Sequence, residues 1–172
     1  MSVHSFQNMI SFTSERNCMW DKYRHESKQT ICIIGVLILS AKLCRADGHF
    51  SEREEEEILK IVPHETQQKK ILVRILEEAY NDPSPIEHDA RNLKALLEDE
   101  HLEFLEFIVA ALYKLAHTDH IYSEAEDEDI RSVANIFGIT KGFFDQTQET
   151  IKNYFDKATS SLRNRKKEKI NA

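Results

Sequence analysis

Two related stretches decide the fold of this chain: Leu39–Glu54 (LSAKLCRADGHFSERE) and Lys114–Glu126 (KLAHTDHIYSEAE). When the chain is shifted against itself by 72 residues, Lys, Leu, Asp, Ser and two Glu coincide, and Ile58 falls on Ile130. In each copy an apolar run ends at a turn, and Ser followed three residues later by Glu opens the next run, as in a helix capping box. The repeat predicts a duplicated helix–turn–helix unit and a bundle with internal pseudo-twofold symmetry.

Helical signals also fill the rest of the chain. The run Thr30–Ala41 is apolar on every face but only about a dozen residues long, whereas a bilayer span needs about twenty, so it predicts a buried core helix. Ser84–Leu97 predicts a helix with Ser as its cap and Pro at its first position. Gly48 and Gly138 suit the left-handed residue that ends a helix, and a last helix is expected from Thr140. With no alternating strand pattern, and only 4 Gly and 3 Pro, the sequence predicts an all-α bundle of about seven helices.

The charge of the chain is unevenly distributed. Lys and Arg number 23 against 30 Asp and Glu, a net charge of −7, yet Arg163–Lys169 holds five basic residues and one Glu. The remaining body is therefore strongly acidic and would repel nucleic acid and anionic lipid. We expect an N-terminal extension with helical spacing of apolar residues over 1–26, a helical domain over 27–158, and a basic tail or linker over 159–172. Membrane contact, where it occurs, is expected through the extension or the tail.

The cysteines and the known sequence motifs indicate the cellular compartment and the class of protein. Cys18, Cys32 and Cys44 are odd in number and lack C-x-x-C spacing, which predicts buried thiols in a reducing compartment. No secretory signal pattern opens the sequence. The sequence contains no nucleophile elbow, phosphate-binding loop, H-E-x-x-H helix or dinucleotide fingerprint. These features favour a cytoplasmic, non-enzymatic protein, at most peripheral at the inner face of a membrane.

Each copy of the repeat also carries an Asp where its first helix ends and a Glu seven positions later. Such oxygen-only ligands suit calcium or magnesium better than zinc, which makes these carboxylates candidate metal ligands. The four candidates are Asp47, Glu54, Asp119 and Glu126. The alternative is structural, because Ser and Glu are explained as helix caps and Asp as a turn acceptor. Neither copy is an EF-hand, since Ile58 or Ile130 stands where a bidentate Glu is required.

Histidine offers one further metal hypothesis. His117 and His120 flank Asp119 and form a conceivable zinc set, although histidines of a solvated turn explain the pattern as well. No other cofactor is indicated by the sequence.

The two motifs resemble a known family. Leu39–Glu54 resembles the A-K-A-D-G-x-x-x-x-x-E signature of TerB-like domains, which are named for a tellurite-resistance protein. The second copy, with Ala134–Thr140 (ANIFGIT) downstream, is similar to the second signature of that family. The order of elements over Ser27–Ala158 is most similar to the TerB-like domain that precedes the J domain in DjlA-type co-chaperones. The second copy departs from the pattern, with His120 in place of the turn glycine.

The resemblance implies a seven-helix fold, the four motif carboxylates as candidate metal positions, and a recruitment or regulatory role. Its implied partner is a protein of a chaperone system or of a stress response. None of the 3 prolines follows a histidine, so this chain lacks the His-Pro-Asp tripeptide of a J domain. The alternative function is a divalent-metal-binding stress protein of the tellurite-resistance type.

Overall fold

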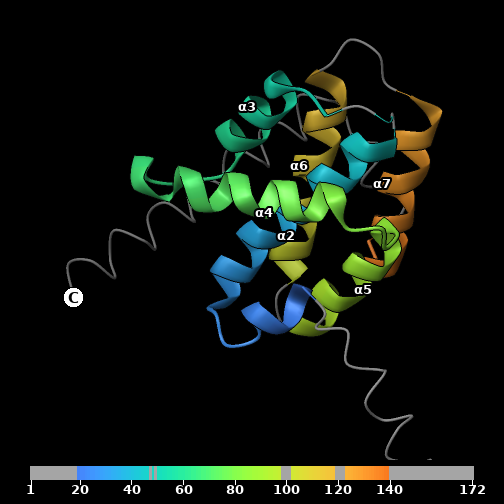
Figure 1. The fold of residues 1–172 in the computed structure, drawn as a ribbon. Coiled ribbons are helices and arrows are strands. Elements are labelled where there is room, and N and C mark those ends of the chain that lie inside the picture. Colours follow the sequence, from blue (N-terminus) through green and yellow to red (C-terminus); the bar gives the residue numbers. More distant parts are fainter. Residues whose placement is uncertain (1–18, 47, 49, 98–101, 119–122, 140–172) are drawn as a thin grey trace, which may run out of the picture.

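The computed structural model describes residues 19–46, 48, 50–97, 102–118 and 123–139. These residues form six α-helices and two short 3₁₀ helices, with no strand among them, which confirms the predicted all-α bundle (Figure 1). The elements are η1 (Met19–Tyr23), α2 (Lys28–Ala46), α3 (Glu52–Ile61), η2 (Thr66–Gln68), α4 (Lys69–Asn81), α5 (Ile86–Leu97), α6 (Leu102–Thr118) and α7 (Glu124–Phe137). The helix predicted from Thr140, which would bring the count to seven, lies outside the described residues.

Helix α2 is the centre of the bundle and packs against α4, α5, α6 and α7. Every residue from Ile31 to Cys44 except Ile33 is buried. By length and composition α2 is the one described helix that would suffice to cross a membrane, but most of it is buried inside the bundle. A helix surrounded by other helices needs apolar side chains all round its circumference, which explains the apolar run in the sequence.

The close packing of α2 on α5 depends on a glycine. A Cβ atom added at Gly35 would lie 2.5 Å from Cδ2 of Leu93, which is fully buried in the core. Real Cβ atoms do not approach other atoms this closely, so any larger residue at position 35 would force the two helices or the Leu93 rotamer to move.

The duplicated helix–turn–helix unit is present in the structure as α2–α3 and α6–α7. Helices α3 and α7 begin at Glu52 and Glu124, 72 residues apart. Gly48 follows α2 with φ 71°, and Gly138 ends α7 with φ 72°, so both glycines adopt the left-handed conformation predicted for them. The end of α2 and the start of α3 lie at the upper end of the bundle in Figure 1, as do the end of α6 and the start of α7.

Two helix starts differ from the sequence prediction. Apolar residues recur every three or four positions over 65–80, which predicts a helix from Glu65, but this segment begins with the 3₁₀ turn η2 and becomes α-helical only at Lys69. The helix expected to start at Pro85 with Ser84 as its cap begins at Ile86 instead. The Ser84 hydroxyl bonds to the Asp82 carboxylate and accepts from Lys42, so a tertiary contact uses the side chain that a local cap would need.

Candidate functional site

The first motif turn is closed by a reciprocal capping box. Ser51 Oγ accepts from the Glu54 backbone N–H at 3.2 Å, and Glu54 Oε2 accepts from the Ser51 backbone N–H at 2.7 Å and from the Ser51 hydroxyl at 2.9 Å. These bonds satisfy N–H groups that a helix start leaves without partners. The same oxygen of Glu54 therefore accepts hydrogen bonds from both the backbone and the side chain of Ser51.

The second motif turn repeats this geometry. Ser123 Oγ accepts from the Glu126 N–H at 3.2 Å, and Glu126 Oε2 accepts from the Ser123 N–H at 2.9 Å and its hydroxyl at 3.1 Å. Glu126 is only 8% exposed, whereas Glu54 is half-buried. Both predicted Glu ligands thus serve as caps, and each carboxylate is turned back toward its own helix start.

Of the remaining predicted metal ligands, the structure describes only His117. Asp47, Asp119 and His120 lie outside the described residues. His117 lies near the end of α6, where its Nδ1 is 2.8 Å from the Tyr113 carbonyl oxygen and its ring is tilted over the Tyr113 ring at 3.9 Å. Among the side chains that the structure describes, no group of three or more His, Cys, Asp or Glu is arranged to hold a metal ion.

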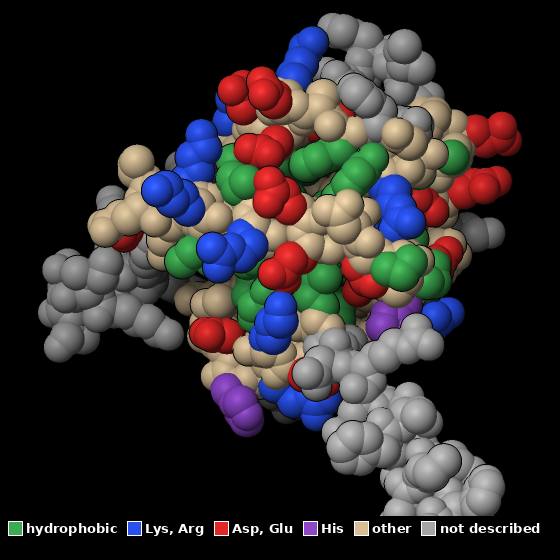
Figure 2. Space-filling model, viewed as in Figure 1, with side chains coloured by type: hydrophobic (Ala, Val, Ile, Leu, Met, Phe, Trp, Pro, Cys, Tyr) green, Lys and Arg blue, Asp and Glu red, His purple; other side chains and the backbone are tan. Residues whose placement is uncertain are grey.

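The carboxylates beside each capping Glu face solvent. Glu52 and Glu56 on α3 and their repeat equivalents Glu124 and Glu128 on α7 are all exposed. Figure 2 shows acidic side chains gathered over α3 and along the edge formed by α7. We call these four residues the acidic motif face.

A second concentration of negative charge lies where α5 packs on α7. Burial, together with the negative charges of Glu87, Glu128 and Glu126, raises the pKa of Asp129 to about 6. The packing of α5 against α7 thus brings the Glu87 carboxylate toward Asp129, which already has Glu126 and Glu128 as neighbours on its own helix.

The most extensively bonded polar group of the interior is one that the motif search missed. Lys42 in α2 is 4% exposed. Its Nζ donates to the Ser84 carbonyl oxygen at 2.6 Å and hydroxyl at 3.2 Å, and to the Asp82 carbonyl oxygen at 2.7 Å and carboxylate at 3.0 Å. A carboxylate oxygen of Asp89 lies 3.5 Å away. We call Lys42, Asp82, Ser84 and Asp89 the lysine cage.

The lysine cage also fixes the 3₁₀ helix η1. Asp89 is 1% exposed, and its Oδ1 accepts a hydrogen bond from Trp20 Nε1 at 2.9 Å. Burial raises the pKa of Asp89, while the Trp20 hydrogen bond and the Lys42 charge act in the opposite direction. Burial also acts to raise the pKa of Asp82, but hydrogen bonds from Ser84 and Lys42 outweigh it and lower that pKa. The only sequence signal for this cage is a lysine within an apolar helix.

The predicted buried thiols are present at two of the three cysteines. Cys32 and Cys44 are free and buried, and Cys18 lies outside the described residues. Burial raises the pKa of the Cys32 thiol far above its usual value, and Cys32 Sγ lies 3.8 Å from the Phe104 carbonyl oxygen. A thiol in this state is inert and belongs to the core.

Taken with the capped motif turns, this architecture defines an all-α bundle built on a duplicated acidic helix–turn–helix. Residues 34–149 match the family model described as tellurite resistance protein TerB, and the chain belongs to that family. The match includes both motif turns, which confirms the TerB-like resemblance seen in the sequence. No curated protein matches the chain, and neither does any solved structure.

Proposed function

We propose that this TerB-family chain is a non-enzymatic interaction and regulatory domain that recruits a protein through the acidic motif face. The observation that carries the proposal is the repetition of exposed carboxylates at equivalent positions: Glu52 with Glu124, and Glu56 with Glu128. The capping Glu of each turn is used internally, so the exposed pair beside it is the part of each motif that a partner can contact.

The chemistry of this face indicates a basic partner surface. An exposed cluster of one charge sign raises the local concentration of oppositely charged partners and orients them before contact. The two copies lie at the same end of the bundle, so a single partner with Lys or Arg side chains can meet both. The same negative potential disfavours nucleic acid as the ligand.

The finer role rests on the motif resemblance alone. We propose that the partner belongs to a chaperone system, the role expected of the TerB-like domain in a DjlA-type co-chaperone. The order of elements over Ser27–Ala158, which is similar to that of this domain, supports this assignment. The free thiols of Cys32 and Cys44 support a cytoplasmic location, since a reducing compartment keeps such thiols free.

Site-specific photo-crosslinking in cells tests the recruitment proposal. A photoreactive amino acid replaces Glu56 on α3 or Glu128 on α7, and Arg91 on the exposed face of α5 serves as the control position. We expect adducts with one and the same protein from positions 56 and 128, and none from position 91. Adducts absent at 56 and 128, or identical at all three positions, would contradict the proposal.

A divalent-cation function is the second candidate, with Asp47, Glu54, Asp119 and Glu126 as ligands. The observation in its favour is the crowding of carboxylates around Asp129: besides burial, the negative charges of Glu87, Glu128 and Glu126 raise its pKa, and a bound cation would relieve their repulsion. Calcium or magnesium suits these oxygen donors better than zinc.

Isothermal titration of calcium, magnesium, manganese and zinc into chelator-stripped protein tests this candidate. Two variants separate ligation from folding: Asp47→Asn/Asp119→Asn, and Glu54→Gln/Glu126→Gln, in which glutamine retains the capping box. Micromolar binding that both variants lose, with unchanged thermal stability of the metal-free protein, would establish the site. Absence of binding by the parent protein would leave both Glu as caps only.

A further inference from the structure

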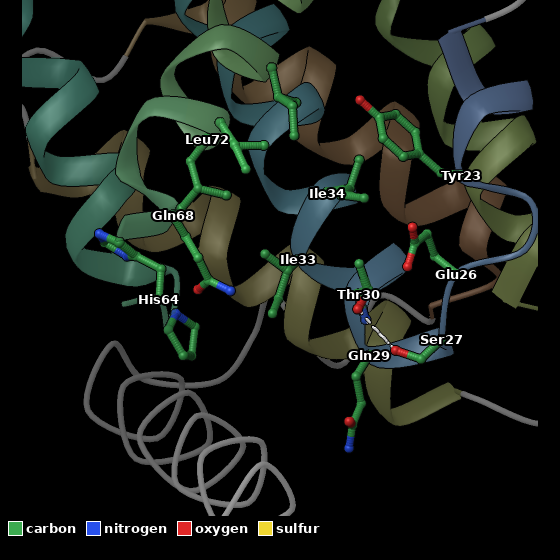
Figure 3. Close-up of a pocket in the computed structure, with 13 residues that line it drawn as sticks. Tyr23, Glu26, Ser27, Gln29, Thr30, Ile33, Ile34, His64, Gln68 and Leu72 are labelled. Atoms are coloured by element: carbon green, nitrogen blue, oxygen red, sulfur yellow. Dashed lines mark hydrogen bonds between the residues drawn. The ribbon is translucent and has the colours of Figure 1, made fainter. Parts of the chain in front are cut away.

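A mostly apolar groove opens on the side of the bundle away from the contacts of α2 with α5, α6 and α7. The groove has a volume of about 460 Å³ and lies between the first half of α2, the connection from α3 to α4, and α4 itself. Ile33, Ile34 and Leu72 point into it, as Figure 3 shows. Ile71 on its α4 wall is 62% exposed and is the only large hydrophobic residue among the described residues with such exposure. This volume suits a few apolar side chains of a bound segment.

The polar lining of the groove is almost free of charge. Around the apolar floor the lining groups are amides, hydroxyls and one imidazole, and Glu26 is the one carboxylate. Charged side chains lie outside it, on the solvent side of α4, where Lys69, Lys70 and Arg74 are exposed. These lysines and this arginine would repel a basic segment such as Arg163–Lys169.

One segment of this chain has the matching composition. In a chain of which 31% of the residues are charged, residues 1–14 (MSVHSFQNMISFTS) contain no Asp, Glu, Lys or Arg. Val3, Phe6 and Ile10 follow the i, i+3, i+7 spacing of a helix that inserts one apolar face into a groove. The segment also lies outside the family match at 34–149.

The connection to the groove is short. The segment leads into η1, and Tyr23 at the end of η1 forms part of the groove lining. From Met19 to Tyr23 a 3₁₀ helix advances about 8 Å, and the seven-residue step from Phe12 to Met19 spans up to about 25 Å when extended. A tethered segment meets the groove at an effective concentration in the millimolar range, so even modest apolar contact keeps it bound.

From this match of shape, charge and reach we infer that the groove between α2 and α4 is the docking site of this chain's own uncharged segment, with Val3, Phe6 and Ile10 as its apolar anchors. Docking covers Ile71. The inference is independent of the acidic motif face.

Paramagnetic broadening of methionine methyl signals in the full chain tests this inference. The chain has 3 methionines, Met1, Met9 and Met19, so a ¹³C-methyl-methionine spectrum separates the segment from η1. A nitroxide is attached at Lys70→Cys beside the groove, or at Arg91→Cys on α5 as the matched control, both in a Cys18→Ser background. Cys32 and Cys44 are buried and do not compete for the label.

We expect the Met9 signal to lose most of its intensity with the label at position 70 and to keep it with the label at position 91. Adding Ile71→Asp to the Lys70→Cys protein restores the Met9 signal, while an unchanged Met19 signal shows that the fold is intact. Equal broadening from both labels, or broadening that survives Ile71→Asp, overturns the inference. Broadening in a mixture of nitroxide-labelled and ¹³C-labelled molecules also overturns it, because the occupant is then a second copy.

Discussion

A lysine ammonium in a helical core is costly unless its surroundings replace the lost water. In place of water, Lys42 Nζ contacts oxygens of Asp82 and Ser84 in the α4–α5 connection, and a carboxylate oxygen of Asp89 in α5 lies nearby. Desolvation of such a pair can cancel the attraction between its charges, so the cage is weak evidence for extra stability. Removing one partner is different, because the other charge is then left buried without compensation.

The first prediction concerns this asymmetry. Lys42→Met is expected to lower the free energy of unfolding by about 3–5 kcal/mol, because Asp89 remains buried without its cation. Urea unfolding measures the change. The double variant Lys42→Met/Asp89→Asn should cost clearly less than the sum of the single changes, since it removes the orphaned charge as well. Lys70→Met, an exposed change on α4, is the control and should stay within about 0.5 kcal/mol.

The second prediction concerns Asp129 and pH. Its pKa is about 6 in the folded protein, above the ordinary 3.8, so the folded state binds the proton more tightly. The contribution of Asp129 to stability is therefore full below pH 3.8 and is lost as the pH rises through about 6. Asp129→Asn should stabilise the protein at pH 7.5 by about 1 kcal/mol, a value reduced for partial solvent exposure, and the gain should vanish near pH 4.

Thermal unfolding of both proteins from pH 4 to pH 8 measures this effect. Glu77→Gln on the exposed face of α4 is the matched control, for which no pH-dependent gain is expected. A gain of Asp129→Asn that is constant across this range would show that ionisation of this half-buried carboxylate is not its cause.

At the scale of elements, α2 and α5 approach each other closely at Gly35. Gly35→Ala gains helix propensity of up to about 1 kcal/mol but inserts a methyl group against Leu93. Overpacking of this kind costs about 1–3 kcal/mol, so a net destabilisation is expected in urea unfolding. Gly35→Ala combined with Leu93→Ala should be less destabilising than the two single changes added together, because the space vacated by Leu93 accepts the methyl group.

Most helix boundaries of this fold are set by residues that are close together in the sequence, so they were predictable. The capping residues Ser51 and Ser123 lie three positions from their Glu partners, so both helix starts are visible in the sequence. Gly138 marks the end of α7 for a similar reason. The start of α5 was misplaced because Ser84 bonds to Lys42, a residue 42 positions away, and no local pattern reports such a contact.

The candidate site was likewise predictable from the sequence only where its residues are close together in the chain. Glu54 and Glu126 lie where the repeat placed them, at the first turns of α3 and α7. Their carboxylates turn toward the caps, and this orientation follows from hydrogen-bond geometry rather than from residue type. The lysine cage was missed because Lys42 and Asp89 meet only after α5 has packed on α2.

At the scale of the whole molecule, the segment predicted as an extension is partly integral to the domain. Trp20 is 2% exposed and bonds to Asp89, and Lys22 pairs with Glu78 at 3.0 Å. A chain that begins at Ser27 should therefore be less stable by about 3–5 kcal/mol than one that begins at Met19, because it loses a buried tryptophan. Urea unfolding followed by circular dichroism compares the two. Removal of residues 159–172, the basic tail, is the control truncation and should leave the unfolding midpoint unchanged.

The lysine cage has a consequence for how the protein depends on its environment. Five oxygens converge on one ammonium group, which occupies the place that a metal ion takes in a coordination sphere. The ammonium group belongs to the Lys42 side chain of α2. Unlike a bound metal ion, its presence at this site therefore does not depend on the concentration of free ions. Chelators and changes in the ionic composition of the cell leave the lysine cage assembled, whatever cation the acidic turns attract.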